Sequence, residues 1–430
     1  MIFIERVFVL KTPTMRLKRF LLRYFPPGIA LEYIQGGKTK TKMLGLSSLS
    51  TRTNVNELAA TIAADEPLVT PSVVPQLVES LCKLQTKLSD ASNHWFHNSK
   101  TLKTHLLPLT NVAFDKQGKR CLTGSYDRTC KVWDTDSGKE LCTLKGHKNV
   151  VYAVTFNSPF DDKILTGSFD KTACLWSAET GECYSTLWGH TAEVVAVQFN
   201  LQCHLVGTSS MDSTAKLFNI ATGQEVATLH GHTGEVIALK FSDDGNQIIT
   251  GSFDHSIGVW DTRTAKRVGI LNGHLQEISN CLFNHDGSLI ASSSMDKTAK
   301  VWDQRTFSSL ATITGHNDEV LDIAFDYKGH QLATASTDAT ACIWDVHSDF
   351  KLLAKMKGHK EEVSKVCFSP AGARLLTASL DRTARLWNAD TGNCIQILDG
   401  HTDDVFSCAF SYNGDIIITA SKDNTCKIWR

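Results

Sequence analysis

Serine, histidine and aspartate recur together along this sequence, and these residue types are the components of a hydrolase triad. One such set is His147, Ser168 and Asp170. Seven more serines stand two residues before an aspartate: Ser125, Ser210, Ser252, Ser294, Ser336, Ser379 and Ser421. Eight identical active sites in one chain are implausible. We therefore predict a structural role for these residues and no catalytic residue.

The sets belong to a repeat marked by histidines that stand 42 or 43 residues apart: His105, His147, His190, His232, His274, His316, His359 and His401. An aromatic residue closes each unit: Trp133, Trp176, Phe218, Trp260, Trp302, Trp344, Trp387 or Trp429. We expect a buried network from Asp to His, from His to Ser, and from Ser to the indole N–H. An unpaired buried polar group costs about 1–3 kcal/mol, so such a network would hold loops to strands. Phe218 leaves its unit without the indole donor.

Short alternating runs such as VYAVTF and KILTGS lie between these markers and predict four strands in each unit. A period near 42 with Gly-His and Trp-Asp markers is the WD-repeat signature. The predicted fold class is all-β: an eight-bladed WD-repeat β-propeller with a small α+β N-terminal domain. The sequence ends at the third strand of its eighth unit, so residues 95–103 are expected to supply the closing strand.

Three segments are expected: an unstructured extension over residues 1–14, a basic α+β domain over 15–94 and the propeller over 95–430. The spacing of Leu17, Phe20, Leu21 and Tyr24 predicts a short amphipathic helix. Its cations, a candidate partner-binding set or simply a solvated face, are Arg16, Lys18, Arg19 and Arg23. A hairpin turning at Gly36-Gly37 should follow, and then two helices, one capped by Asn54 and one opening at Thr70-Pro71.

Composition excludes several function classes. The chain has 44 Lys plus Arg against 45 Asp plus Glu, without the basic excess typical of nucleic-acid binders. Residues 1–94 carry 12 basic and 7 acidic side chains, whereas residues 95–430 carry 32 and 38. Thirteen cysteines without a CxxC pair indicate a reducing, cytosolic environment. No apolar run of about 18 residues indicates a membrane span. No metal or cofactor motif is present, so we expect no cofactor.

Two repeat positions beside the markers are candidates for partner binding. The residue before the Asp is large and apolar in six units: Tyr126, Phe169, Met211, Phe253, Met295 and Leu380. The third residue after the His is acidic in six units: Glu193, Glu235, Glu277, Glu319, Glu362 and Asp404. An apolar ring beside an acidic ring suits a basic, partly hydrophobic peptide. Alternatively, acidic residues are common at this repeat position, and the apolar side chains pack on neighbouring loops.

Three stretches carry a closer resemblance: MRLKRFLLRYFPPGIALEY at 15–33, GSYDRTCKVWD in the first blade, and the final DGHTDDVFSCAFSYNGDIIITASKDNTCKIWR. From Met15 to Arg430 the chain resembles the family of dynein assembly factors with WD repeats. The resemblance implies a monomeric cargo adaptor that links preassembled outer-arm axonemal dynein to a subunit of intraflagellar transport complex B. It implies a location in the cytoplasm and at the ciliary axoneme and basal body. A ubiquitin-ligase substrate receptor or another signalling scaffold is the alternative, and an enzyme is the weakest one.

Overall fold

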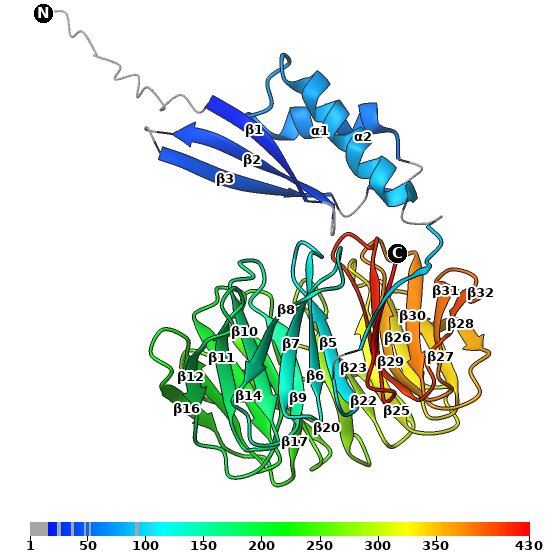
Figure 1. Ribbon diagram of the computed structural model, residues 1–430. Helices are drawn as coiled ribbons and strands as arrows, with labels where there is room; N and C mark the ends of the chain where they lie inside the picture. The colour runs from blue at the N-terminus through cyan, green and yellow to red at the C-terminus, as the bar shows by residue number, and fades with distance from the viewer. Residues whose placement is uncertain are drawn as a thin grey trace, which may run out of the picture. The chain divides into compact units, whose positions relative to one another are not determined.

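The computed structural model describes residues 16–23, 27–35, 38–46, 49–50, 53–90, 94–103 and 105–430. The chain divides into two compact units, Met1–Asn93 and His94–Arg430, which are described separately (Figure 1). The extension expected over residues 1–14 lies outside the described residues. Within the described ranges, no helix is long and apolar enough to cross a membrane.

The N-terminal unit combines a three-stranded antiparallel sheet with two helices. The strands pair in the order β1-β2-β3, and the elements are β1 (Arg16–Arg23), β2 (Gly28–Gln35), β3 (Lys38–Gly45), α1 (Val55–Asp65) and α2 (Val74–Asp90). Strands β2 and β3 pair from Gly28↔Gly45 to Gln35↔Lys38, as the predicted hairpin requires. The turn at Gly36-Gly37 itself lies outside the described residues.

The predicted basic helix is wrong, because residues 16–23 form the strand β1. The register slips between Leu17 and Arg19, where Leu17 pairs with Tyr33 and Arg19 with Glu32. This bulge places one extra residue in β1, so Leu17 and Phe20 fall on the same face of the sheet although they are three residues apart. A spacing of three, typical of a helix, therefore also fits a bulged strand.

Both helices exist, and the cap of the first is as predicted. The side chain of Asn54 accepts a hydrogen bond from the backbone N–H of Asn56 at 3.1 Å. Helix α2 begins at Val74 rather than at Thr70-Pro71. Pro75 falls in its first turn, where the missing N–H costs nothing. The predicted apolar stripe is buried at Leu77, Leu81, Leu84 and Leu88 and half-buried at Val74 and Val78.

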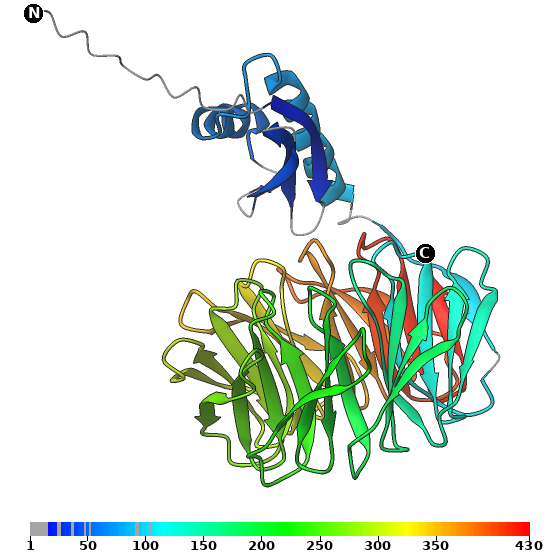
Figure 2. The same cartoon turned by 90° about the vertical axis from the view of Figure 1, so that its left-hand side faces the viewer.

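The second unit consists of eight four-stranded antiparallel sheets, the blades, arranged around a central axis (Figures 1 and 2). Blades 1 to 4 contain β5 (Leu109–Phe114), β6 (Arg120–Ser125), β7 (Thr129–Asp134), β8 (Glu140–Lys145); β9 (Val151–Phe156), β10 (Lys163–Ser168), β11 (Ala173–Ser177), β12 (Cys183–Leu187); β13 (Val194–Phe199), β14 (Leu205–Ser210), β15 (Ala215–Asn219), β16 (Glu225–Leu229); and β17 (Val236–Phe241), β18 (Gln247–Ser252), β19 (Ser256–Asp261), β20 (Arg267–Asn272).

Blades 5 to 8 contain β21 (Ile278–Phe283), β22 (Leu289–Ser294), β23 (Thr298–Asp303), β24 (Ser309–Thr314); β25 (Val320–Phe325), β26 (Gln331–Ser336), β27 (Thr340–Asp345), β28 (Lys351–Lys357); β29 (Val363–Phe368), β30 (Arg374–Ser379), β31 (Ala384–Asn388), β32 (Cys394–Leu398); and β33 (Val405–Phe410), β34 (Ile417–Ser421), β35 (Cys426–Trp429), β4 (Asn98–Leu102). The eight-bladed WD-repeat propeller predicted from the sequence is confirmed.

The hydrophobic core lies between neighbouring blades rather than within one blade. Trp176 of blade 2 packs with Leu122 and Val132 of blade 1, together with Val151 and Ile164 of its own blade. A single blade has two apolar faces and cannot bury both alone, so each blade needs a neighbour on either side. The ring supplies these neighbours, and its loops project from two opposite faces.

Blade 8 is assembled from segments more than 300 residues apart. Its fourth strand is β4, which pairs with β35 from Leu102↔Cys426 to Asn98↔Trp429. Beyond this register, the backbones of His97 and Arg430 exchange hydrogen bonds of 2.6 and 2.9 Å. Phe96 is only 1% exposed and belongs to the core between blades 7 and 8. The segment before His105 thus covers the outer edge of blade 8.

Candidate partner-binding face

Each blade contains a buried network of histidine, aspartate and a hydroxyl group. In blade 2, His147 Nδ1 lies 2.8 Å from Asp170 Oδ2, and its Nε2 lies 2.7 Å from the hydroxyl of Thr166. The indole N–H of Trp176 donates to the same hydroxyl at 2.8 Å. The predicted network is therefore present with one correction: the hydroxyl belongs to Thr166, not to Ser168.

The register of the strands explains this correction. Trp176 pairs with Ile164, so Thr166 lies two residues along β10 and Ser168 lies four. At about 3.3 Å per residue, Ser168 is out of reach of the indole. Its hydroxyl instead donates to the carbonyl of Asn149 at 3.2 Å and accepts from the N–H of Asp170 at 3.1 Å, which fixes the loop that carries the histidine.

The same correction applies to every blade. The hydroxyls that bind the histidines are those of Thr123, Thr166, Thr208, Thr250, Ser292, Thr334, Thr377 and Thr419. Each stands two residues before the serine named from the sequence. This recurring hydroxyl was visible in the sequence, but the repeat alone could not decide which of two hydroxyls faces the tryptophan.

Burial and hydrogen bonding fix the charge states of the network. Burial lowers the pKa of His190, His316 and His359, against the opposing effect of their aspartates. Burial alone would raise the pKa of Asp170, but hydrogen bonds from His147 and Thr172 hold it well below its ordinary value. In blades 3, 6 and 7 the histidine is therefore neutral: Nδ1–H donates to the aspartate, and Nε2 accepts from the threonine. Every donor has an acceptor, and the threonine hydroxyl is fully buried.

The apolar and acidic positions predicted for partner binding are direct neighbours in each blade. The backbone N–H of Phe253 donates to the carbonyl of Glu235 at 2.8 Å, and Met211 donates to Glu193 at 3.0 Å. The same bond joins Met295 to Glu277, Leu380 to Glu362, Tyr126 to Pro108, Phe169 to Val150, Thr337 to Glu319 and Lys422 to Asp404. The structure thus brings both sets together on one face, here called the rim face, in the side-by-side arrangement predicted from the sequence.

Exposure differs among these side chains. Tyr126, Met211, Glu235 and Glu362 are exposed, whereas the half-buried ones are Phe169, Phe253, Met295, Leu380, Glu193, Glu277, Glu319 and Asp404. The half-buried apolar side chains contribute both to loop packing and to the surface. The packing alternative therefore applies to the half-buried side chains, and partner binding at these positions stays a prediction.

One arc of the rim face is apolar. In blades 1 and 2 the acidic position is taken by Pro108 and Val150. Leu106, directly after His105, is 82% exposed. The ring of Tyr152 stacks on that of Phe169 with centroids 5.2 Å apart. The sequence did not single out Leu106 and Tyr152, because the residue type at their two positions differs from unit to unit.

The opposite character appears in blades 6 to 8. Their histidine loops add a second acidic residue directly before the first: Asp318 before Glu319, Glu361 before Glu362, and Asp403 before Asp404. Lys297 lies 3.3 Å from Asp318, and Lys422 lies 3.2 Å from Asp404, so two cations offset part of this charge. Blade 8 packs directly against blade 1. The acidic arc therefore adjoins the apolar arc where the ring closes.

The cations of the N-terminal unit are partly neutralised. Lys18 and Arg19 lie 2.7 and 2.5 Å from the two carboxylate oxygens of Glu32. Arg23 stands opposite Gly28 at the end of β1, and the side chain of Arg16 lies outside the described residues. The structure therefore places Lys18 and Arg19 in one ion-pair cluster on the sheet, not on the face of a helix.

The family model described as WD domain, G-beta repeat, matches eight consecutive stretches: 96–134, 138–177, 181–219, 223–261, 265–303, 307–345, 350–388 and 392–430. The chain belongs to the WD-repeat family. The first matched stretch begins with the segment that closes blade 8. Among the described residues of this WD-repeat protein, no group of three or more His, Cys, Asp or Glu side chains is arranged to hold a metal ion.

Several relatives of this chain carry the same name. The chain is 57% identical over 150 residues to the mouse protein named dynein assembly factor with WD repeat domains 1, 56% to the human one and 54% to that of zebrafish. Each match covers 35% of this chain and spans 36% of the relative, a shorter stretch than Met15–Arg430. A computationally designed protein, Ika8, superimposes with a TM-score of 0.69 at 30% identity, covering 76% of this chain and 98% of the design.

Proposed function

We propose that this chain is a non-catalytic adaptor in the assembly of outer dynein arms. It binds preassembled outer-arm axonemal dynein and a subunit of intraflagellar transport complex B, and it thereby delivers the motor into cilia or flagella. Relatives named dynein assembly factor support this role. Those matches span about a third of each relative. The activity and partners of the whole chain are therefore proposals.

The observation that carries the proposal is the uneven rim face. A rim that merely completed the fold would need no difference between blades. Exposed apolar side chains are nevertheless most numerous on blades 1 and 2, with Met211 and Leu275 exposed on blades 3 and 5, and paired acids occur on blades 6 to 8. Apolar anchors within a charged border are typical of protein-binding surfaces. The rim face therefore suits a basic, partly hydrophobic segment of one partner, and the cationic sheet of the N-terminal unit is the candidate surface for the second.

We extend this proposal to location and assembly state. The adaptor works as a monomer in the cytoplasm, at the basal body and along the ciliary axoneme. The balance of 44 basic and 45 acidic residues argues against nucleic acid as a partner, and neither a membrane nor a cofactor is required.

Affinity capture from ciliated cells tests the proposal, with the full chain as bait. Dynein-arm and transport-train subunits are the expected preys, whereas ubiquitin-ligase subunits would favour the alternative. Reversing charge on the rim face with Glu235→Lys and Glu277→Lys should slow association of one partner and flatten its dependence on salt. The matched control is Glu179→Lys with Glu182→Lys, which changes two exposed acids on the opposite face. Equal effects of the two pairs would show that the rim face is not the site.

A further inference from the structure

A lysine on the third strand of a blade has a fixed partner in blades 1 and 3. Lys131 Nζ lies 2.7 Å from Glu140 Oε2, and Lys216 Nζ lies 2.9 Å from Glu225 Oε2. Each lysine also donates to a threonine on the fourth strand, Thr143 at 3.1 Å and Thr228 at 2.7 Å. The lysine, threonine and glutamate thus form a repeated ion-pair unit.

Blade 8 repeats this arrangement without the carboxylate. Lys427 occupies the lysine position, only 8% exposed, and Thr101 stands opposite it in the register. Asn98 precedes Thr101 by three residues, as Glu140 precedes Thr143, so an amide takes the place of the glutamate. The difference arises because the fourth strand of blade 8 is β4. Turned to present its oxygen, the Asn98 amide lies 3.2 Å from Lys427 Nζ.

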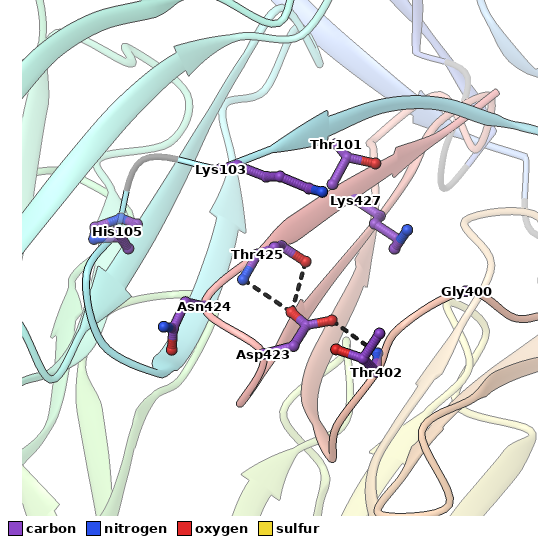
Figure 3. A pocket seen from close by; sticks show the side chains of 9 residues that line it. All are labelled: Thr101, Lys103, His105, Gly400, Thr402, Asp423, Asn424, Thr425 and Lys427. Carbon is purple, nitrogen blue, oxygen red and sulfur yellow. Dashed lines mark hydrogen bonds between the residues drawn. The ribbon is translucent and has the colours of Figure 1, made fainter.

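A second lysine faces the same space. Lys103 follows the last residue of β4 and corresponds to Lys145 of blade 1. Together with Thr101, Lys427 and the loop around Gly400, it lines a cavity of about 290 Å³ (Figure 3). Neither lysine forms an ion pair with a carboxylate among the described residues. Burial lowers the pKa of Lys427, and the charge of Lys103 acts in the same direction, whereas Asp423 and Asp399 oppose it.

The nearby aspartates do not replace the missing glutamate. Asp423 lies 2.9 Å from His401. It also accepts from the N–H of Thr402 at 3.0 Å and from both the hydroxyl and the N–H of Thr425 (Figure 3). Asp399 is exposed on the surface. Lys300 of blade 5 also lacks a glutamate, but it donates to Thr312 at 2.6 Å, and Thr314 stands where blade 8 has Lys103. The two uncompensated lysines beside a cavity are thus particular to blade 8 among the described blades.

The glycine loops show where the missing group would stand. A Cβ built on Gly189 would lie 2.9 Å from Glu225 Oε2 and 3.4 Å from Lys216 Nζ. A Cβ built on the corresponding Gly400 would lie 3.3 Å from Lys427 Nζ, with no carboxylate beside it. The cavity of blade 8 therefore opens at the place that blade 3 fills with a carboxylate of its own.

We propose that this cavity is a carboxylate-binding site that receives a glutamate or aspartate side chain of a partner protein. The incoming carboxylate binds Lys427, Lys103 and Thr101. It thereby takes the place that Glu140 occupies in blade 1 and Glu225 occupies in blade 3. A buried ammonium group without a counter-ion is costly, so a carboxylate that reaches it gains a strong, charge-assisted hydrogen bond. The cavity shares no residue with the apolar and acidic rim positions, although the histidine loop of blade 8 contributes to its lining, and the site does not depend on the proposed dynein role.

The test uses the full chain with glutarate as the probe for a carboxylate side chain, inorganic phosphate as the second probe and chloride at equal ionic strength as the reference. Glutarate should raise the unfolding midpoint saturably. Asn98→Glu places the carboxylate inside the blade, so this variant should melt higher and require at least about tenfold more glutarate for half-saturation. The matched control Ser309→Glu adds the same charge at the corresponding position of blade 5, and its glutarate dependence should be that of the unaltered chain.

A second variant keeps the test decisive if Asn98→Glu disturbs β4. Lys103→Ala removes one exposed cation and should weaken glutarate binding by at least about tenfold while the chain stays folded. Equal glutarate effects on the unaltered chain, Asn98→Glu and Lys103→Ala would overturn the proposal, because they would show a general salt effect. A response to phosphate without one to glutarate would also overturn it, since the site would then bind a different anion.

Discussion

The buried network and the rim face occupy the same loops, but the network is the same in every blade whereas the rim face differs from blade to blade. The His–Asp pair and its hydroxyl recur in all eight blades, with His Nε2 to hydroxyl distances of 2.7–2.8 Å. The exposed positions a few residues away change from Leu106 and Tyr126 in blade 1 to Glu361 and Glu362 in blade 7. Uniform positions therefore build the fold, and uneven positions are where a partner can distinguish one blade from another.

Blade 8 combines a uniform feature with one that differs from the other blades. It has the common network, but its fourth strand comes from before the first blade. The borrowed strand closes the ring and also brings Asn98 to a glutamate position. Damage to closure or to the network should therefore lower stability, whereas damage to the rim face should weaken binding alone.

Removing the closing strand is expected to have the largest effect. A chain that begins at Ser92 keeps Phe96 and β4 and should retain a folded propeller. A chain that begins at His105 loses the pairing with β35 and the apolar cover of blade 8, which favours aggregation or cooperative loss of the ring. Circular dichroism melts of the two chains measure the difference.

The two truncations also separate the two proposed surfaces. The chain that begins at Ser92 should keep the partner of the rim face and lose any partner that needs the N-terminal unit. Equal stability of both chains would refute the role of β4 in closure. Retention of every partner by the chain that begins at Ser92 would refute the two-surface adaptor.

Acid should destabilise the networks of blades 3, 6 and 7 through their histidines. The pKa of His190, His316 and His359 lies below the ordinary value of 6.5, so the unfolded chain takes up protons first as the pH falls. The pKa of Asp170 likewise lies below 3.8. Stability is thus expected to decrease below pH 6.5 through the histidines, and further near pH 3.8 through the aspartates. Unfolding midpoints measured from pH 8 to pH 3 check both steps, and a flat profile would contradict the neutral-histidine network.

How far the sequence predicts the structure depends on how often a feature repeats. Blade number and strand pattern appear eight times, so errors in one unit are corrected by the others. The strand β1 occurs once, and one bulge at Lys18 gives it the spacing of a helix. The choice between Thr166 and Ser168 recurs in every unit, but it depends on strand register, which the sequence does not display. The cavity at Lys427 depends on which distant segment closes blade 8.

Truncating two aromatic residues on the rim face tests binding without folding. Phe169→Ala with Phe253→Ala should weaken one partner by at least about 2 kcal/mol, since half-buried aromatic anchors dominate such surfaces. The unfolding midpoint should stay nearly unchanged. The matched control is Thr166→Val in the network, which leaves the Trp176 N–H without an acceptor and should cost about 1–3 kcal/mol of stability with little effect on binding. Parallel loss of folding and binding in the phenylalanine variant would place these residues in the core.

The smallest expected effect lies in blade 3, where Phe218 is 1% exposed and offers no indole donor. The sequence pointed to Ser210 as the deficient partner, but the geometry shows that it is Thr208, whose hydroxyl lies 2.8 Å from His190 Nε2. Phe218→Trp should therefore stabilise the chain by about 0.5–1.5 kcal/mol through one added hydrogen bond. The larger ring acts against this gain, because overpacking a core filled by Phe costs about 1–3 kcal/mol when neighbours cannot move. The reciprocal change Trp260→Phe converts blade 4 to the arrangement of blade 3 and should lower the unfolding midpoint. A lower midpoint for both variants would mean that packing, rather than the missing donor, sets the stability of blade 3.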